Sequence, residues 1–417
     1  MKYALAAVLA AVTLSGEIRT TTYRGRPAVA NQVIVRIQAG GALPPGDLVP
    51  LSASSGLYLL RSPRKSVADL VAEARGFTVE PDYIVHTQDL ATVPLESQYA
   101  LLWGLSRIGA PAAWSISTGS PSVSAAVIDS GIDYTHPDLA ANVWSAPAEY
   151  TVWFGNTPVT CPAGSHGFNA INLSCDPMDD NGHGTHVSGT LGAAGTGLRG
   201  LVGVTQSSPL VGIKFVNQYG NGALSDAIRG IDFALQLNRI FPRMNLRVLS
   251  ASWGSFQYSQ LLEDMIAQAG NNNILFVTAA GNSALNIDYG VNRFYPASYP
   301  LANIIPVTAA DEKDGIAGFA NFGPKTVTVS APGVRILSTY LNGGYATGSG
   351  TSMATPHVAG AAVLIFAACP WLGVRDAKQL IYSTADTMSP ESSFMITGGR
   401  LNVNAAVRAC PGFVAVP

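Results

Sequence analysis

The chain has 417 residues, of which 47% are hydrophobic and only 12% are charged, so it is too apolar for a disordered protein. Its formal net charge is −2 and no cluster of Lys and Arg occurs, so a nucleic-acid partner is not expected. The length exceeds that of a usual single domain and predicts one large domain with a smaller element beside it.

The N-terminal segment has the pattern of a secretory signal peptide. It begins with the cationic Lys2, continues in an apolar run at 4–12, and reaches the small residues Ser15 and Gly16. We therefore expect residues 1–16 to direct export and the protein to be secreted and extracellular. The alternative is a buried N-terminal helix. The apolar run is shorter than the roughly 20 residues of a membrane span, so no membrane anchor is expected.

The next segment predicts a small α+β unit. Alternating apolar residues predict a strand at 32–37, and a second apolar run predicts another at 57–60, with a loop rich in Gly and Pro between them. Ser66 is the expected cap of a helix that ends at Gly76, before a strand-like segment at 77–79.

From about residue 100 onward, short runs rich in Val and Ile recur between helical segments. Continuous apolar runs are typical of strands buried on both faces of a parallel sheet. The expected strands lie at 124–128, 210–216, 247–251, 274–280 and 304–309, and the expected helices at 225–240 and 259–269. We expect an α/β fold with a doubly wound, mostly parallel sheet, helices on both faces, and a site at the carboxyl ends of the strands.

Four polar residues stand at junctions of these elements. Asp129 and Asn282 follow expected strands, and His183 lies between glycines, a position that suits an accessible and rigidly held general base. Ser352 precedes an apolar helix, whose amide groups and dipole would stabilise an oxyanion beside the hydroxyl. Each residue alone would be read as a turn or capping residue. Their coincidence favours a catalytic site.

Three segments resemble the catalytic blocks of the subtilisin family of serine peptidases. They are VIDSGID at 127–133, NGHGTHV at 181–187 and GTSMATPHVAG at 350–360, and their order of Asp, His and Ser is that of subtilisins. The resemblance runs from about residue 95 to the end. It also reaches residues 79–85, which are similar to the end of a subtilisin propeptide.

The resemblance implies a serine endopeptidase that cleaves proteins or peptides through an acyl-enzyme and needs no cofactor for its chemistry. Ser352 would be the nucleophile, His183 the general base and then acid, Asp129 the carboxylate that orients the histidine, and Asn282 an oxyanion donor.

Two further histidines, His186 and His357, would then be structural. A metal site that joins His183 and His186 is the alternative, but neither an HExxH pattern nor a clear third ligand accompanies them.

The implied substrate-binding residues form an edge strand that pairs with peptide backbone, a pocket wall and a pocket floor. They are Ser252, Trp253, Gly254, Ala280, Gly281 and Phe294. The ring of Phe294 is expected to restrict the pocket, so a strong preference for Arg or Lys is not expected.

Two segments depart from the family pattern. Asp138 resembles a calcium ligand of many subtilisins, but residues 195–200 lack the Asn usually present there, so a structural calcium ion is left open. The insert at 143–175 is longer than in compact members of the family and is expected to alter the rim of the cleft.

The four cysteines are expected to form two disulfides, because secreted proteins meet an oxidising environment. They allow three pairings, and we prefer Cys161 with Cys175 and Cys369 with Cys410, since each pair brackets a local loop or the C-terminal segment. A zinc site of Cys161, His166 and Cys175 is the alternative, but the paired CxxC spacing of zinc ligands is absent.

The expected precursor has a signal peptide at 1–16, a propeptide at 17–92 that assists folding and blocks the cleft, and a peptidase domain at 93–417. A monomer is expected. The cut is expected near 87–93, within a polar linker at 86–94. A permanent accessory domain is the alternative for the small unit.

Three other functions are weighed against the peptidase. A binding protein that kept the peptide groove would be indicated by loss of a triad residue, and none is lost. A related acid peptidase would carry Glu in place of His183. A lipase would show a GxSxG elbow and the order Ser, Asp, His, which this chain lacks.

Overall fold

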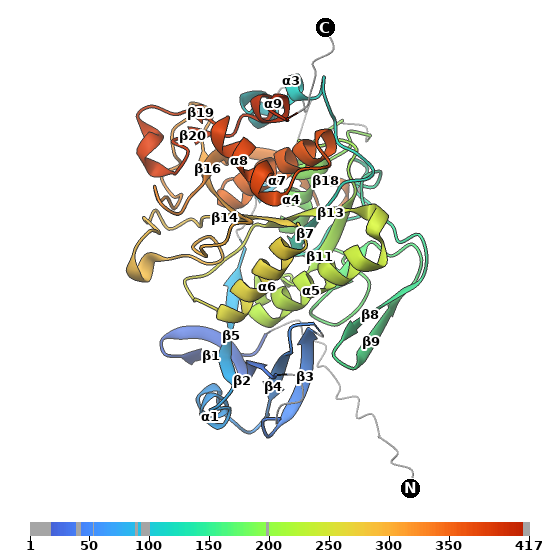
Figure 1. The fold of residues 1–417 in the computed structure, drawn as a ribbon, viewed down its shortest axis with the longest axis vertical. Helices are drawn as coiled ribbons and strands as arrows, with labels where there is room; N and C mark the ends of the chain where they lie inside the picture. The colour runs from blue at the N-terminus through green and yellow to red at the C-terminus, as the bar shows by residue number, and fades with distance from the viewer. Residues whose placement is uncertain are drawn as a thin grey trace.

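The computed structural model describes residues 18–38, 43–52, 54–87, 91–92, 101–196 and 200–411. The expected signal peptide lies outside these residues. The described chain forms a small N-terminal unit and a larger domain, which are in contact (Figure 1).

The N-terminal unit is an antiparallel sheet with one helix. Along the sheet the strands run β5 (Thr78–His86), β2 (Arg26–Arg36), β4 (Leu57–Arg61) and β3 (Asp47–Ser52), and β1 (Thr20–Tyr23) pairs with β2. Helix α1 (Val67–Glu73) begins after Ser66, which forms a capping box with Asp69. The small core joins the helix to the sheet through Val33, Val35, Leu60 and Leu70.

Two predictions for this unit were wrong in extent. Strand β3 lies within the predicted loop, where it tolerates Pro50 because it is an edge strand with a ladder on one side only. The strand predicted at 77–79 continues as β5 to His86, which was expected to open the linker at 86–94. His86 instead pairs with Asn221 of the larger domain, and most of the remaining linker lies outside the described residues.

The larger domain contains a sheet of nine strands within the described residues. Their order is β10 (Gly167–Asn169), β11 (Leu210–Lys214), β7 (Ser124–Asp129), β13 (Leu246–Ala251), β14 (Leu275–Ala279), β15 (Ile304–Ala310), β16 (Val329–Pro332), β20 (Gly399–Arg400) and β19 (Asp386–Thr387). Every pair is parallel except β19 with β20. The predicted central strands are therefore present, and the fold is α/β.

Helices cover both faces of this sheet (Figure 1). One face packs on α5 (Leu224–Ile240) and α6 (Gln260–Asn271), and the other on α4 (His183–Gly192) and α7 (Thr351–Ala368), with α8 (Val374–Ser383) and α9 (Val403–Arg408) beside α7. Adjacent residues of β7 show why its sequence is continuously apolar. Val127 belongs to the cluster around α7 and Ile128 to the cluster around α5, and both are fully buried.

Shorter elements surround the sheet. The remaining helices are α2 (Trp103–Arg107) and α3 (Ala110–Ala113), with 3-10 turns at Pro242–Met244, Gly290–Asn292, Leu341–Gly343 and Glu391–Phe394. The remaining strands are β6 (Ala91–Thr92), β12 (Asn221–Ala223), β17 (Ile336–Tyr340), β18 (Gly344–Gly348), and the hairpin of β8 (Tyr150–Phe154) with β9 (Thr157–Cys161). Helix α7 has the length and hydropathy of a membrane span, but 89% of that span is buried inside the domain, as in a core helix.

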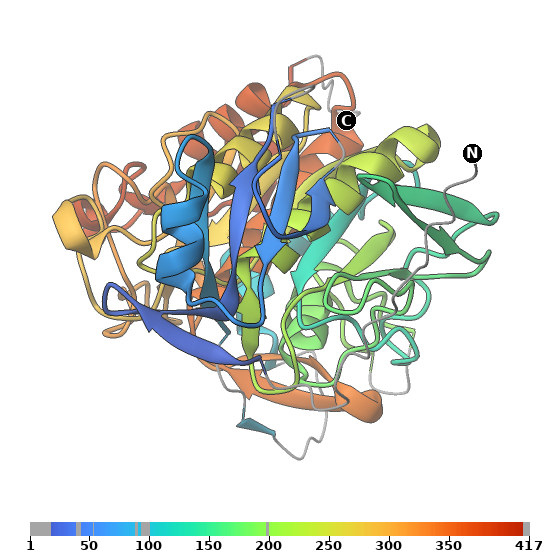
Figure 2. The ribbon, with the colours of Figure 1, turned by 90° about the horizontal axis from the view of Figure 1, so that it is seen from below.

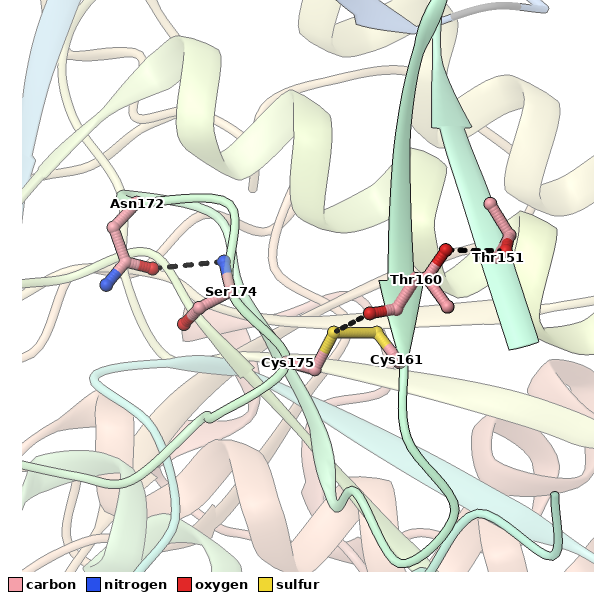
Figure 3. The surroundings of a disulfide bond; sticks show 6 residues. All are labelled: Thr151, Thr160, Cys161, Asn172, Ser174 and Cys175. Carbon is pink, nitrogen blue, oxygen red and sulfur yellow. Dashed lines mark hydrogen bonds between the residues drawn. A yellow bond between two sulfur atoms is a disulfide. The ribbon is translucent and has the colours of Figure 1, made fainter. Parts of the chain in front are cut away.

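Both disulfides follow the preferred pairing. Cys161 is bonded to Cys175 (Figure 3) and Cys369 to Cys410, with Cα atoms 5.4 and 6.3 Å apart. The zinc alternative was wrong, because both of its cysteines are in a disulfide. Its histidine, His166, makes a hydrogen bond of 2.9 Å between Nδ1 and the carbonyl oxygen of Trp144.

Candidate active site

Three segments meet at the carboxyl ends of the central strands. Strand β7 ends at Asp129, helix α4 begins at His183, and helix α7 begins one residue before Ser352. Gly182 precedes His183 with a φ of +100°, and a Cβ atom there would lie 2.1 Å from the ring of Tyr340. Glycine is therefore required for the entry into α4 that brings His183 to Asp129.

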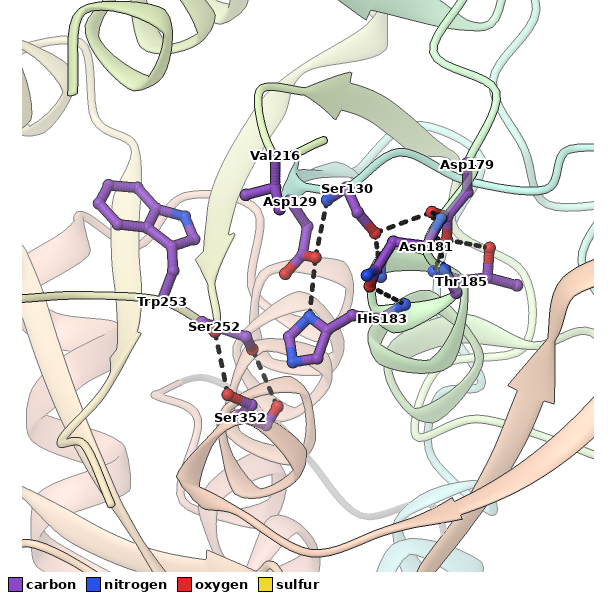
Figure 4. A network of polar contacts seen from close by, with 12 residues as sticks. Asp129, Ser130, Asp179, Asn181, His183, Thr185, Val216, Ser252, Trp253 and Ser352 are labelled. Atoms are coloured by element: carbon purple, nitrogen blue, oxygen red, sulfur yellow. Dashed lines mark hydrogen bonds and ion pairs between the residues drawn. The ribbon is translucent and has the colours of Figure 1, made fainter. Parts of the chain in front are cut away.

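Asp129 and His183 form a buried hydrogen bond (Figure 4). Oδ1 of Asp129 lies 2.8 Å from Nδ1 of His183 and also accepts the backbone N–H of Ser130 at 2.7 Å. Both side chains are fully buried. The outward atoms, Oδ2 of Asp129 and Nε2 of His183, have no hydrogen-bond partner among the described residues. The pair is thus oriented through Oδ1 and Nδ1, while one buried polar atom of each residue is left without a partner in the described part of the chain.

A second carboxylate, Asp179, holds the segments that carry this pair (Figure 4). Its Oδ1 accepts the hydroxyl of Ser130 at 2.8 Å, and the same hydroxyl accepts the N–H of Gly184 at 2.8 Å. Its Oδ2 accepts the N–H and hydroxyl of Thr185 at 2.9 and 2.6 Å. Sequence reasoning did not single out Asp179, although it lies four residues before His183 in the same motif.

Lys214 was also missed. It ends the otherwise apolar strand β11 and is almost fully buried. Its ammonium group donates to the carbonyl oxygens of Ser130 and Val216 at 2.7 and 3.0 Å and to Asp180 at 2.6 Å. A single Lys at the end of an apolar strand was the available signal, since a buried ammonium group needs such partners.

Ser352 exchanges two hydrogen bonds with Ser252. The Ser352 hydroxyl donates to the carbonyl oxygen of Ser252 at 2.9 Å, and the Ser252 hydroxyl donates to the carbonyl oxygen of Ser352 at 2.9 Å. In this conformation the hydroxyl of Ser352 is engaged with the edge strand rather than with Nε2 of His183 (Figure 4).

Asn282 is bonded to the residue that begins α7. Its Oδ1 accepts the N–H of Thr351 at 2.9 Å and the Thr351 hydroxyl at 3.0 Å. Because the oxygen is used in this way, the amino group of the side-chain amide remains for another acceptor. Asn282 and Ser352 line the same cavity.

This cavity has a volume of about 330 Å³ and includes five of the six predicted substrate-binding residues. The five are Ser252, Trp253, Gly254, Gly281 and Phe294. Cβ atoms on Gly254 and Gly281 would lie 2.4 and 3.0 Å from the ring of Phe294, so the ring fills the space between them. Ala280 is the exception, because it is fully buried in an apolar cluster on which Phe294 packs, and Ala279 lines the cavity.

The other two histidines of the motifs are enclosed. Burial lowers the pKa of His186 to about 3 and that of His357 to about 4, so both rings are neutral at ordinary pH. Nε2 of His186 lies 3.0 Å from the carbonyl oxygen of Ile336, and Nδ1 of His357 lies 2.9 Å from that of Met353. The described residues contain no group of three or more His, Cys, Asp or Glu that fits a metal ion.

Asp138 was the expected calcium ligand. It is fully buried, and its Oδ2 accepts the Tyr345 hydroxyl at 2.6 Å and the N–H of Leu201 at 3.3 Å. Calcium takes six to eight oxygen ligands, and within the described residues Asp138 belongs to no cluster of carboxylates. Backbone and amide oxygens also bind calcium, and residues 197–199 of the neighbouring loop lie outside the described residues, so the calcium site stays a prediction.

The insert at 143–175 contributes none of the residues that line the cavity. Its hairpin, β8 with β9, contacts strand β3 of the N-terminal unit and helix α5 instead. Its expected effect on the rim is not seen at this cavity, because the apolar side of the hairpin is buried against the unit.

Comparisons with known proteins agree with this geometry. The model of the subtilase family matches residues 120–403. The chain is 33% identical over 329 residues to a thermophilic serine proteinase of Bacillus sp. (strain AK1), covering 79% of this chain and 72% of that protein. It is 34% identical over 307 residues to subtilisin BL of Lederbergia lenta, covering 73% of this chain and 98% of that protein.

A third relative is the minor extracellular protease Epr of Bacillus subtilis (strain 168). It is 35% identical over 257 residues, which are 62% of this chain and 34% of that protein. The parallel sheet, the paired Asp and His beside a serine, and these matches lead to one conclusion. This chain belongs to the subtilase family and is a serine endopeptidase, of a family that needs no cofactor for its chemistry.

Proposed function

We propose that the chain is the precursor of an exported peptidase whose catalytic triad is Asp129, His183 and Ser352, and that its propeptide lies within residues 17–92 and ends at the cut. The observation that carries the proposal is the buried bond of 2.8 Å between Asp129 and His183, with Nε2 left open beside the N-terminus of α7. Export is supported by the signal-like pattern at 1–16 and by two disulfides.

In the proposed mechanism, the hydroxyl oxygen of Ser352 attacks the carbonyl carbon of the scissile bond while Nε2 of His183 takes its proton. Asp129 stabilises the imidazolium ion that results. The backbone N–H of Ser352 and the side-chain amide of Asn282 bind the oxyanion of the tetrahedral intermediate. His183 then protonates the leaving amine, which departs and leaves an acyl-enzyme on Ser352. Water hydrolyses the acyl-enzyme by the same steps in reverse order.

The bond between Ser352 and the carbonyl of Ser252 suggests how a substrate prepares the nucleophile. A peptide that pairs with the edge strand Ser252–Gly254 would donate its own N–H to that carbonyl oxygen. The Ser352 hydroxyl would then lose its acceptor and rotate toward Nε2 of His183. Binding of the substrate backbone and activation of the nucleophile would therefore be coupled.

The cavity supports a preference for uncharged residues before the scissile bond. No lining residue carries a carboxylate that would pair with Arg or Lys, and the ring of Phe294 fills the space between Gly254 and Gly281. A strong preference for Arg or Lys in peptide cleavage assays would contradict this proposal.

The end of the N-terminal unit lies where a substrate strand is expected. His86 pairs with Asn221 on one side and bridges to Gly254 on the other, and the N–H of Thr87 donates to the carbonyl oxygen of Gly220 at 2.9 Å. Addition of a strand between two edges is a mode of peptide binding. This occupancy supports a propeptide that blocks the cleft rather than a permanent accessory domain.

Two carboxylates of the unit bind helix N-termini of the peptidase. Asp82 accepts the N–H and hydroxyl of Ser225 at 2.9 and 2.7 Å, at the start of α5, whose own cap residue makes no side-chain bond. Glu80 accepts the N–H of Gln260 at 2.8 Å and the hydroxyl of Ser259 at 2.5 Å, at the start of α6. Capping of unpaired N–H groups stabilises helix ends, so these contacts support a folding role for the unit.

The strand register also predicts the cut. A substrate that continued the antiparallel register of His86 with Gly254 would place the residue two positions after His86 opposite Ser252, whose carbonyl oxygen is 2.9 Å from the Ser352 hydroxyl. That residue is Gln88, which lies outside the described residues. We therefore propose cleavage between Gln88 and Asp89, within the interval expected from the sequence.

The test compares secreted expression of the wild type with that of Ser352→Ala. We expect the wild type to begin at Asp89 and to hydrolyse casein, and the variant to stay uncut and to lose at least about 10⁴-fold in activity. A wild type that is folded, freed of its unit and still inert would favour a binding protein. An active enzyme that keeps residues 17–92 would favour an accessory domain.

A further inference from the structure

The hairpin of β8 and β9, residues 150–161, lies against the N-terminal unit outside the cleft. Strand β8 contacts the edge strand β3, and the two lie side by side in both views of the ribbon (Figures 1 and 2). At the hairpin turn, a Cβ atom on Gly155 would lie 2.5 Å from Cβ and from Cγ of Pro50. The turn is therefore in close contact with the ring of Pro50.

Apolar side chains of the hairpin and the unit share one cluster. Val152 and Phe154 are buried in the cluster that contains Leu51 and Leu59 of the unit. Phe154 also stacks on Phe168 of the larger domain, with ring centroids 5.2 Å apart. Loss of the unit would expose part of this cluster, so the hairpin contributes apolar contact area to the interface.

A series of hydrogen bonds joins the N-terminal unit, the hairpin and helix α5 of the larger domain. The hydroxyl of Ser52 in the unit donates to Oδ1 of Asp232 in α5 at 2.6 Å, and Gln236 donates to Oδ2 of Asp232 at 2.7 Å. The side-chain oxygen of Gln236 accepts the backbone N–H of Trp153 in β8 at 2.8 Å. The side-chain amino group of Gln236 donates to the carbonyl oxygen of Trp153, also at 2.8 Å. One turn of α5 therefore holds both the hairpin and the unit.

The hairpin has its own support at the base. The last residue of β9, Cys161, is cross-linked to Cys175, which restricts the hairpin independently of the unit (Figure 3). A surface restricted before binding loses less conformational freedom when its partner docks.

We propose that this hairpin is a docking element for the unit's edge strand β3, and that it retains the unit on the peptidase after the cut and so delays activity. The proposal rests on the proposed function of residues 17–92 as a propeptide. Its partner is the apolar edge strand of this same chain, so retention depends on a contact outside the cleft.

The first test is Gly155→Asn in the full chain that also carries Ser352→Ala. Gly155 has a φ of +60°, which Asn tolerates better than most residues, but the new Cβ atom collides with Pro50. The matched control is Gly164→Asn, at a φ of +84° with no atom within 4 Å of the new Cβ. We expect Gly155→Asn to speed digestion of the unit by added trypsin at least about fivefold, which is the change expected from the destabilisation that an overpacked contact causes. The control should leave the rate of digestion unchanged.

A second variant removes the collision. Pro50→Gly combined with Gly155→Asn leaves only Cα of residue 50 near the new Cβ, at 3.9 Å, and is expected to restore most of the slow digestion. Equal rates of tryptic digestion for Gly155→Asn and Gly164→Asn would overturn the proposal. Digestion of the double variant as fast as that of Gly155→Asn would also overturn it.

If the hairpin variants do not fold, Pro50→Asp leaves the peptidase sequence intact and sets a charge against the apolar contact. We expect it to speed digestion, and an unchanged rate would overturn the proposal. Because Ser352→Ala chains need no activity for this readout, an inert wild type would contradict the proposed function without affecting the result. In the active chain, Gly155→Asn is expected to shorten the delay between the cut and casein hydrolysis.

Discussion

The active site and the interface of the N-terminal unit both rely on buried carboxylates, but they use them differently. At the interface, both oxygens of Asp82 accept hydrogen bonds, as do both oxygens of Glu80. At the site, only Oδ1 of Asp129 has partners, and Oδ2 and Nε2 of His183 have none among the described residues.

The difference separates a structural contact from a reactive one. A buried polar atom without a partner costs free energy, so most buried polar atoms of a structural contact are paired. In the proposed mechanism, Nε2 of His183, unpartnered among the described residues, accepts the proton of the Ser352 hydroxyl. Removal of a carboxylate at the site is therefore expected to lower activity, and removal of one at the interface is expected to weaken retention of the unit.

The largest effect is expected from Asp129→Asn. The amide keeps the shape of the side chain but does not stabilise an imidazolium ion, so kcat should fall by about 10⁴-fold while the folded structure remains. Steady-state peptide hydrolysis and the melting temperature would be measured together. Asp376→Asn, at an exposed position in the first turn of α8, is the control and should keep full activity. A similar loss in the control would contradict a specific role for Asp129.

A smaller effect is expected from Asn282→Leu. This change removes the proposed oxyanion donor and also the acceptor for Thr351, and loss of one such donor lowers kcat by about 10²–10³-fold. Since the donor acts on the intermediate, KM should change little. Thr351→Val removes one of the two bonds to Asn282 without removing the amide and should cost much less. A change confined to KM would show that Asn282 binds substrate rather than the oxyanion.

A third prediction concerns the interface. Asp82→Ala leaves the start of α5 without its cap from the unit, which costs about 0.5–2 kcal/mol, and should speed tryptic digestion of the unit in the Ser352→Ala chain by about 2- to 30-fold. Activity of the mature enzyme should not change, because Asp82 has then been removed. Glu73→Gln, at an exposed position in α1, is the control. Retention that is unaffected by Asp82→Ala would contradict a holding role for this carboxylate.

The two regions are also expected to respond to pH in opposite directions. Burial lowers the pKa of His186 to about 3 and of His357 to about 4, from an ordinary 6.5. The unfolded chain therefore binds protons that the folded domain does not, and stability of the peptidase falls as pH drops from about 6.5 toward 4.

Burial instead raises the pKa of Asp82 and of Glu80 above their ordinary values of 3.8 and 4.5. Their protonated forms are favoured in the complex, so retention of the unit is strongest below about pH 4 and declines as pH rises through the raised values. Release from the cut complex, followed by gel filtration across this range, should increase with pH, and Asp82→Asn should reduce the response. Release that increases toward acid would contradict this assignment.

Much of the fold and of the candidate site was predictable from the sequence. The strands at 124–128 and 274–280 are continuously apolar because both of their faces are buried, and the glycines around His183 and Ser352 mark places where backbone must approach closely. Strand β3 was missed, because Pro and Gly obscure an edge strand whose pairing is decided by its neighbour β4. The family resemblance implies that Ala280 belongs to the pocket wall, and this assignment stays a prediction. In the structure Ala280 is buried in an apolar cluster while Ala279 and Gly281 line the cavity, which the motif does not reveal.

The parallel sheet and the order of Asp129, His183 and Ser352 could be read from the sequence, because they depend on local apolar patterns and motifs. The four cysteines allowed three pairings, of which one was preferred, and the structure contains that one. The contacts between segments that are distant in the sequence could not be read from it and are seen in the tertiary structure. Examples are the hydrogen bond of Ser352 to Ser252 and the hydrogen bonds of Asp179 and Lys214 to Ser130. Others are the bridge between His86 and Gly254 and the close approach of Gly155 to Pro50. These contacts join residues far apart along the chain, and their geometry is set by how sheets and helices pack together.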